Sequence, residues 1–178
     1  PKTWFRVEDV PRDQPGAFVL KGETNSRKHL WNTHMFAENR KDVMQVFLRL
    51  LDDSLIGGQH ICVRQFVPMK RFDVESIQGL PVTNEWRYFF CDGQLLAGGF
   101  YWSEHFDEVR PSLEWAPPEK FVNEVIERIK SRTRFVVVDF GQKENGDWMV
   151  VELNDGQMSG VSCCDLGELY GNLKRVLE

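Results

Sequence analysis

The chain has 178 residues, of which 42% are hydrophobic and 28% are charged, so it can bury a core as one domain or as two small ones. Its net charge of −5 argues against a general nucleic-acid-binding surface. There is no signal-peptide pattern and no apolar run of about 18 residues, so we expect a cytoplasmic protein without a membrane segment. The four cysteines lack metal-binding or disulfide spacing, and we expect reduced thiols.

The N-terminal third is predicted to form a small sheet with one helix. Short apolar runs bounded by Gly, Pro and charged residues indicate strands, and apolar residues at helical spacing indicate a helix. The predicted elements are strands at residues 4–7, 17–20 and 61–67 and a helix at residues 38–53.

Two basic residues in this region have an unusual strand context. Lys21 lies at a strand end beside Gly22, where a lysine can contact a phosphate as a point charge, although most such lysines are simply solvated. Arg64 lies inside an apolar strand and therefore needs a partner. That partner could be a nucleotide phosphate or a buried carboxylate.

A β-hairpin is predicted in the middle of the chain, with strands at residues 84–91 and 94–102. Asp92-Gly93 is typical of a two-residue type I′ loop, which fixes the pairing. The expected facing pairs are Arg87 with Gly98 and Glu85 with Phe100. A glycine opposite an arginine leaves space for a ligand group above the sheet. The alternative is that Glu85 and Arg87 form an ordinary salt bridge.

A second hairpin is predicted after a helix at residues 119–131, with its strands on either side of Asn145-Gly146. If those two residues form a type I′ loop, Glu144 pairs with Asp147. The same register places Asp139 opposite Glu152 and Val137 opposite Asn154. Strand alternation then puts the two carboxylates and the asparagine on one face.

These three side chains are a candidate metal site. Like charges on facing residues of an antiparallel pair repel, so Asp139 and Glu152 require a proton or a cation between them. Two carboxylates and the amide oxygen of Asn154 are hard oxygen ligands that suit Mg²⁺. No His or Cys accompanies them, which disfavours zinc. The alternative is that all three face solvent as ordinary polar residues.

The pattern of Asp139 in one strand and Glu152-Leu153-Asn154 closing the next resembles the metal-binding signature of the ATP-grasp superfamily. The nearest match is the small clade named for one arginine and two lysines. This resemblance implies an α+β fold of two α+β subdomains with antiparallel sheets gripping ATP between them. Residues 1–67 would form the N-terminal subdomain, and residues 68–178 the C-terminal subdomain with the metal-binding hairpin.

The resemblance also implies roles for individual residues. Lys21 and Lys28 match the two lysines that contact the nucleotide phosphates, and Arg64 matches the arginine of the clade. The hinge that reads adenine through its backbone corresponds to Gln65, Phe66 and Val67, and Gln65 stands where many relatives have an acidic residue. In the Glu-x-Arg segment, Glu85 would lie near ribose or metal and Arg87 near the reacting phosphoryl group. Arg87 and Lys28 are the expected catalytic residues.

The implied function is an ATP- and Mg²⁺-dependent ligase that joins a carboxylate to an amine through an acyl-phosphate. Its substrates would be small molecules or peptides. One alternative is a nucleotide-binding interaction module without turnover. Another is a nucleotidyl or phosphoryl transferase acting on RNA ends, which the acidic net charge disfavours. Typical relatives carry a preceding α/β domain that helps to bind the acceptor, so the sequence leaves the carboxylate and the amine unassigned.

Overall fold

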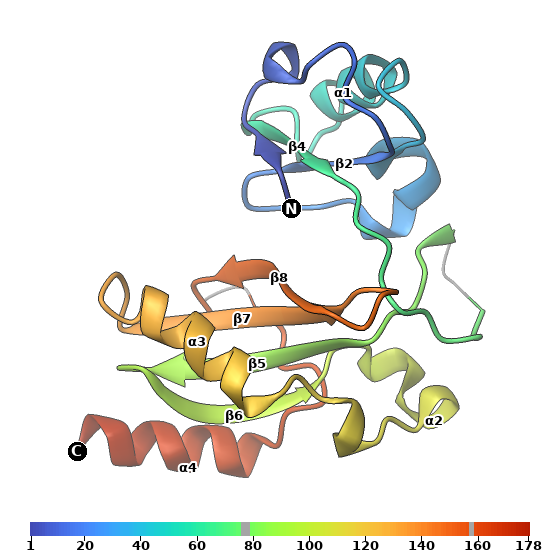
Figure 1. Cartoon of the computed structure of the whole chain (residues 1–178). Coiled ribbons are helices and arrows are strands. Elements are labelled where there is room, and N and C mark those ends of the chain that lie inside the picture. Colours follow the sequence, from blue (N-terminus) through green and yellow to red (C-terminus); the bar gives the residue numbers. More distant parts are fainter. Residues whose placement is uncertain (76–78, 157–158) are drawn as a thin grey trace. The chain divides into compact units, whose positions relative to one another are not determined.

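A computed structural model describes residues 1–75, 79–156 and 159–178 (Figure 1). The chain divides into two compact units, one formed by Pro1–Val67 with Glu75–Pro81 and the other by Pro68–Val74 with Val82–Glu178. Each unit contains one four-stranded sheet whose strand pairs are all antiparallel, together with helices, so the predicted α+β class is confirmed. Within the described ranges, every helix is too short or too polar to cross a membrane.

The N-terminal unit is a sheet with strand order β1-β4-β2-β3 and one longer helix. Its elements are β1 (Thr3–Trp4), η1 (Val7–Asp9), β2 (Phe18–Gly22), η2 (Lys28–Leu30), η3 (Trp31–Met35), β3 (Phe36–Ala37), α1 (Val43–Leu51) and β4 (Ile61–Gln65). Helix α1 begins later than predicted. The Asn39 side chain accepts a hydrogen bond from the Lys41 N–H at 2.9 Å, which stabilises a turn in place of a first helical turn.

The core of this unit lies between α1 and one face of the sheet. Alternate residues of β2 and β4 face the helix, because successive side chains of a strand point to opposite sides. The buried residues of this core include Phe18, Leu20, Ile61 and Val63 from the strands and Val43, Val46 and Leu50 from the helix. The intervening strand residues therefore lie on the opposite face.

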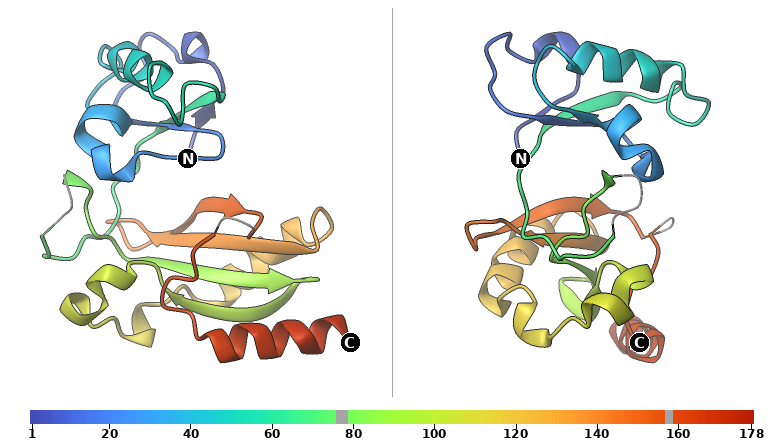
Figure 2. Two further views of the ribbon diagram at one scale, coloured as in Figure 1. Left: turned by 180° about the vertical axis from the view of Figure 1, so that it is seen from behind. Right: turned by 90° about the vertical axis from the view of Figure 1, so that its right-hand side faces the viewer.

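The C-terminal unit is a sheet with strand order β6-β5-β7-β8. Its elements are β5 (Glu85–Cys91), β6 (Gln94–Phe100), η5 (Ser103–His105), α2 (Phe106–Val109), η6 (Leu113–Trp115), α3 (Glu119–Ile129), β7 (Phe135–Gln142), β8 (Trp148–Asn154) and α4 (Leu166–Leu177). The right-hand view of Figure 2 shows α3 and α4 on either side of this sheet. Phe90 packs with residues of α3, whereas its neighbour Phe89 packs with residues of α4.

The β5–β6 hairpin has the predicted loop but a different register beyond it. Asp92 and Gly93 have φ values of 48° and 77°, as a type I′ loop requires. A β-bulge then shifts the pairing between Phe89 and Phe90. Arg87 therefore faces Gly99 rather than Gly98, and Trp86 rather than Glu85 faces Phe100. Because a bulge adds one residue to one strand, a register counted from the turn fails past it.

The β7–β8 hairpin contains two departures from the prediction that cancel. The Lys143 N–H donates to the Asp147 carbonyl at 2.8 Å, so the loop has three residues and the expected pairing of Glu144 with Asp147 is wrong. Gly146, at φ 91°, takes the left-handed position of such a loop. A bulge next to Asp139 then restores the register.

As a result, the pairs that define the candidate metal site are confirmed. They are Asp139 with Glu152 and Val137 with Asn154.

Candidate functional site

Four residues form a row across the sheet of the C-terminal unit, one from each strand. Arg87 on β5 is paired with Gly99 on β6 and with Asp139 on β7, and Asp139 is paired with Glu152 on β8. Residues in direct register on neighbouring strands point to the same face. The sheet therefore brings Arg87 and both expected metal-binding carboxylates together.

Arg87 is the centre of this row. Its Nε donates to Asp139 Oδ1 at 2.8 Å and its Nη2 donates to Asp139 Oδ2 at 2.7 Å, which is a bidentate ion pair. Its Nη1 donates to the Gly160 carbonyl at 2.8 Å, and its guanidinium carbon lies 4.8 Å from the centroid of the Tyr101 ring. Burial lowers the pKa of Arg87, but the hydrogen bonds and charge of Asp139 outweigh that effect and raise its pKa overall.

This ion pair changes the expected picture of two facing carboxylates. Asp139 is only 2% exposed and Arg87 only 7% exposed, so the pair is buried. The cation that the facing carboxylates require is, for Asp139, supplied by the protein itself. The solvent-facing alternative is wrong for Asp139, whereas Glu152 and Asn154 are partly buried.

The donor set fits Mg²⁺ in its chemistry. Within residues 1–75, 79–156 and 159–178, no three His, Cys, Asp or Glu side chains cluster closely enough to hold a metal ion. The expected set has only two carboxylates and takes its third oxygen from Asn154, which shares the face of Glu152 two residues along β8. Mg²⁺ accepts so few protein ligands because it keeps waters and substrate phosphates. Both oxygens of Asp139 already accept a bond from Arg87, so a cation held by their remaining lone pairs would lie beside the positive guanidinium.

Glu85 lies on the same face of β5 as Arg87, two residues away, and is buried. The Thr83 hydroxyl donates a short hydrogen bond to the Glu85 carboxylate. Glu85 faces Gly141 on β7, and this glycine lies against Met69 and Val151. The expected role of Glu85 near ribose or metal stays a prediction.

The space expected above the glycine opposite Arg87 is filled. A Cβ atom on Gly99 would lie 2.5 Å from the Cys163 carbonyl carbon and 2.6 Å from the Cys164 nitrogen. The Cys164 thiol also donates to the Arg87 carbonyl at 3.4 Å. Burial raises the pKa of Cys164 to about 12, so it stays a neutral thiol and acts as a packing residue.

We expect alanine at Gly99 to lower the free energy of unfolding by about 1–3 kcal/mol, because the added methyl group meets backbone atoms that must shift. Alanine at Gly171 is the matched control. Gly171 lies within α4, and a Cβ atom added there would have open space around it, so alanine should raise the free energy of unfolding by about 0.5–1 kcal/mol. Urea denaturation of both variants measures the two values, and equal effects would contradict the close approach at Gly99.

In the N-terminal unit, the sheet brings two of the predicted basic residues together. Lys21 faces Cys62 and Val19 faces Arg64 in the β2–β4 register, so Lys21 and Arg64 are diagonal neighbours on the face away from α1. Burial raises the pKa of Cys62, while the charges of Lys21 and Arg64 both act to lower it. Their common effect on one thiol is consistent with two cations on the same face.

The predicted hinge is partly committed to internal hydrogen bonds. The Gln65 N–H donates to the Lys2 carbonyl at 2.9 Å, and the Phe66 N–H donates to the Ala17 carbonyl at 2.8 Å. These two N–H groups therefore have acceptors within the unit, and the role of the hinge in reading adenine stays a prediction. The Phe66 ring lies edge-on to the rings of Trp31 and Phe36.

Two residues that the sequence did not suggest hold the loop before Lys28. The Gln59 side-chain oxygen accepts hydrogen bonds from the Thr24 N–H at 3.2 Å and the Asn25 N–H at 3.3 Å. Asp53 accepts from Arg27 Nε at 2.8 Å. Both anchors come from the segment after α1, far away in sequence. Lys28 opens η2 next to this loop, so Gln59 and Asp53 can position it.

Arg27 gives the Asp53 carboxylate a pH-dependent contribution to stability. The Arg27 hydrogen bond lowers the pKa of Asp53 to about 2, and the Leu55 and Ile56 N–H groups assist. A lowered pKa stabilises the fold above the unfolded-state value near pH 4 and loses that contribution as pH falls through about 2. We expect Asp53→Asn to lower the melting temperature at neutral pH and to flatten its decline in that acidic range. Parallel declines in thermal melts of variant and wild type would contradict this assignment.

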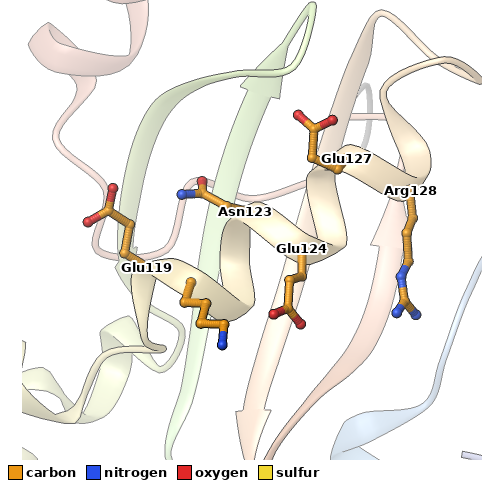
Figure 3. Close-up of a pocket in the computed structure, with 6 residues that line it drawn as sticks. Glu119, Asn123, Glu124, Glu127 and Arg128 are labelled. Carbon is orange, nitrogen blue, oxygen red and sulfur yellow. The ribbon is translucent and has the colours of Figure 1, made fainter.

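A pocket of about 730 Å³ lies elsewhere, on the surface of α3. It is open and lined by residues of that one helix, with mixed charges (Figure 3). The lining residues are Glu119, Lys120, Asn123, Glu124, Glu127 and Arg128. It includes none of the residues of the Arg87 row, and we do not assign it to the site.

Comparison with models of known protein families finds a match over most of the chain. The family described as ATP-grasp domain, R2K clade family 3, matches residues 11–173. The chain belongs to this family. The resemblance inferred from the Asp139 and Glu152-Leu153-Asn154 pattern is thus confirmed, as is the ATP-grasp fold. A search of curated proteins finds no match.

Solved structures with the same fold are distant in sequence. The ATP-grasp ligase PsnB, complexed with minimal precursor, Mg and ADP, is 12% identical with a TM-score of 0.55, over 100% of this chain and 54% of that one. The D-cycloserine synthetase DcsG is 16% identical with a TM-score of 0.50, over 97% of this chain and 60% of that one. The chain thus spans little more than half the length of these two proteins.

Proposed function

We propose that this protein is an ATP- and Mg²⁺-dependent ligase that joins a carboxylate to an amine through an acyl-phosphate. The observation that carries the proposal is the row of Arg87, Asp139 and Glu152 on one sheet face of an ATP-grasp family member. An arginine beside two carboxylates combines a phosphoryl-binding group with oxygen ligands for a divalent cation.

Each predicted residue has a role in this proposal. Lys21, Lys28 and Arg64 neutralise the ATP phosphates, the hinge Gln65, Phe66 and Val67 binds adenine, and Glu85 lies near ribose or metal. Mg²⁺ held by Asp139, Glu152 and Asn154 would neutralise further phosphate charge. Arg87 stabilises the charge that develops on the transferring phosphoryl group.

The chemistry follows from this arrangement of charges. A carboxylate oxygen of the first substrate attacks the γ-phosphorus of ATP, and ADP leaves. The amine then attacks the acyl carbon and phosphate leaves. Little covalent work falls to the protein, because positioning and charge neutralisation supply the acceleration. The substrates are small-molecule or peptide carboxylates and amines, which is consistent with a PsnB structure holding a precursor and with DcsG being a D-cycloserine synthetase.

The first test measures the binding of MgATP through its effect on the melting temperature. A ligand at 100 times its dissociation constant stabilises a protein by about 2.7 kcal/mol, so the wild-type melting temperature should rise. Replacing Lys21 or Lys28 with methionine should remove most of this rise while changing the ligand-free free energy of unfolding by no more than about 0.5 kcal/mol. A variant that is less stable than the wild type but binds ATP as tightly would contradict the phosphate-binding role.

Release of ADP separates turnover from binding alone. We expect amino acids or peptides, supplied as carboxylate and amine together, to stimulate ADP release in the presence of Mg²⁺. Binding of MgATP without stimulated ADP release would favour a nucleotide-binding module. Stimulation by RNA ends instead would favour a nucleotidyl or phosphoryl transferase.

The cytoplasmic localisation expected from the sequence stays a prediction.

A further inference from the structure

Arg87 binds Asp139 through the Nε and Nη2 edge of its guanidinium, an edge with which arginine can also bind a phosphoryl group. The Nε and Nη2 atoms donate to the two carboxylate oxygens in a planar fork, and such a fork matches the geometry of a carboxylate or of a phosphate. The third nitrogen is held separately by the Gly160 carbonyl, and the guanidinium lies over the Tyr101 ring. These two contacts do not use the edge that holds Asp139.

The charges of the row explain why the arginine lies there. A buried carboxylate is costly without a compensating cation, and Asp139 has Glu152 directly opposite as a further negative charge. The row therefore carries one positive and two negative side chains, and its formal charge is negative. A divalent cation would reverse that sign and make the row attractive to phosphate.

We propose that Arg87 stands in for the divalent cation in the metal-free chain, and that cation binding transfers Arg87 from Asp139 to a phosphoryl group. This inference rests on the proposed function, because it takes Asp139 as a metal ligand. A cation bound to Asp139 would lie beside the Arg87 guanidinium, and the two positive charges would repel each other, so the cation alone binds weakly. Once the cation holds Asp139, the Nε and Nη2 edge of Arg87 becomes available to phosphate, so cation and phosphate promote one another's binding.

Calorimetric titration with Mn²⁺, used in place of Mg²⁺, tests whether Arg87 opposes binding of the cation. Arg87→Lys keeps the positive charge but cannot form the fork, so it should bind Mn²⁺ about tenfold more tightly than the wild type. Arg134→Lys is a matched control. Arg134 makes the same two bonds to Asp92, at 2.9 and 2.7 Å, in an exposed position of the same unit. Its replacement should leave the Mn²⁺ affinity unchanged.

A second measurement follows Arg87 in the wild-type chain. The Nε–H signal of Arg87 in a nitrogen-15 NMR spectrum, assigned by its loss in Arg87→Lys, should shift when Mg²⁺ is added and shift again with inorganic phosphate. An unchanged signal at saturating Mg²⁺, together with equal Mn²⁺ affinities of wild type and Arg87→Lys, would overturn the transfer.

The metal site itself is tested separately. If Glu152→Gln binds Mn²⁺ as tightly as the wild type, the proposed metal site fails, and the transfer fails with it. If Glu152→Gln weakens Mn²⁺ binding but Arg87→Lys does not strengthen it and the Arg87 signal does not move, the metal site stands and only the transfer is wrong.

Discussion

Replacing Arg87 with methionine should lower the free energy of unfolding by about 3–5 kcal/mol, because it leaves the buried Asp139 carboxylate without its cation. Such a loss is a large part of the total stability of a small protein. The measurement is urea denaturation of the metal-free protein, in which the midpoint should fall with little change in the denaturant dependence.

Two further variants show whether this loss arises from an unpaired charge. Arg134→Met removes an arginine with nearly the same bidentate geometry, but its side chain is 74% exposed and that of Asp92 is 37% exposed. We expect a loss of no more than about 1 kcal/mol there, since exposed pairs contribute little. The double variant Arg87→Met with Asp139→Leu should recover much of the stability, because apolar residues often replace a buried pair at little cost. Failure to recover would assign the loss to packing of the arginine stem.

The parts of the site that can be predicted are those governed by strand periodicity. The hairpin pattern alone places Asp139 and Glu152 opposite each other, and the structure confirms that pairing. The agreement depends on a longer loop and a bulge that compensate for each other. In the other hairpin no such compensation occurs, and Arg87 faces Gly99 instead of Gly98. A bulge inserts one extra residue into a strand, and the turn residues do not encode where along the strand it lies.

Contacts between distant segments cannot be predicted from sequence patterns. The ion pair of Arg87 and Asp139 joins strands that are adjacent in the sheet but separated by more than one element in the chain. Gln59 and Asp53 likewise bind the loop before Lys28, although helix α1 separates them from that loop in the sequence. Single polar residues of this kind carry no periodicity, so their partners become visible only when the fold brings them together. The roles of Lys21, Lys28 and Arg64 come from the ATP-grasp resemblance, and they stay predictions.

Glutamine at Glu152 should abolish the stabilisation by MgATP while leaving the ligand-free protein as stable as the wild type or slightly more so. The first effect follows because the carboxylate would be a metal ligand, and the wild type should gain about 2.7 kcal/mol at 100 times the dissociation constant. The second follows because Glu152 lies opposite Asp139, and removing its charge relieves a repulsion that offsets the lost attraction to Arg87.

Thermal and urea denaturation with and without MgATP measure both effects. Glu144→Gln is the matched control, because Glu144 is an exposed acid in the loop of the same hairpin and should change neither value by more than about 0.5 kcal/mol. A clear drop in ligand-free stability for Glu152→Gln would mean that its carboxylate is bound to a basic group. The residues proposed to hold Mg²⁺ would then form a structural ion-pair network with Arg87, and the ligase proposal would lose its principal support.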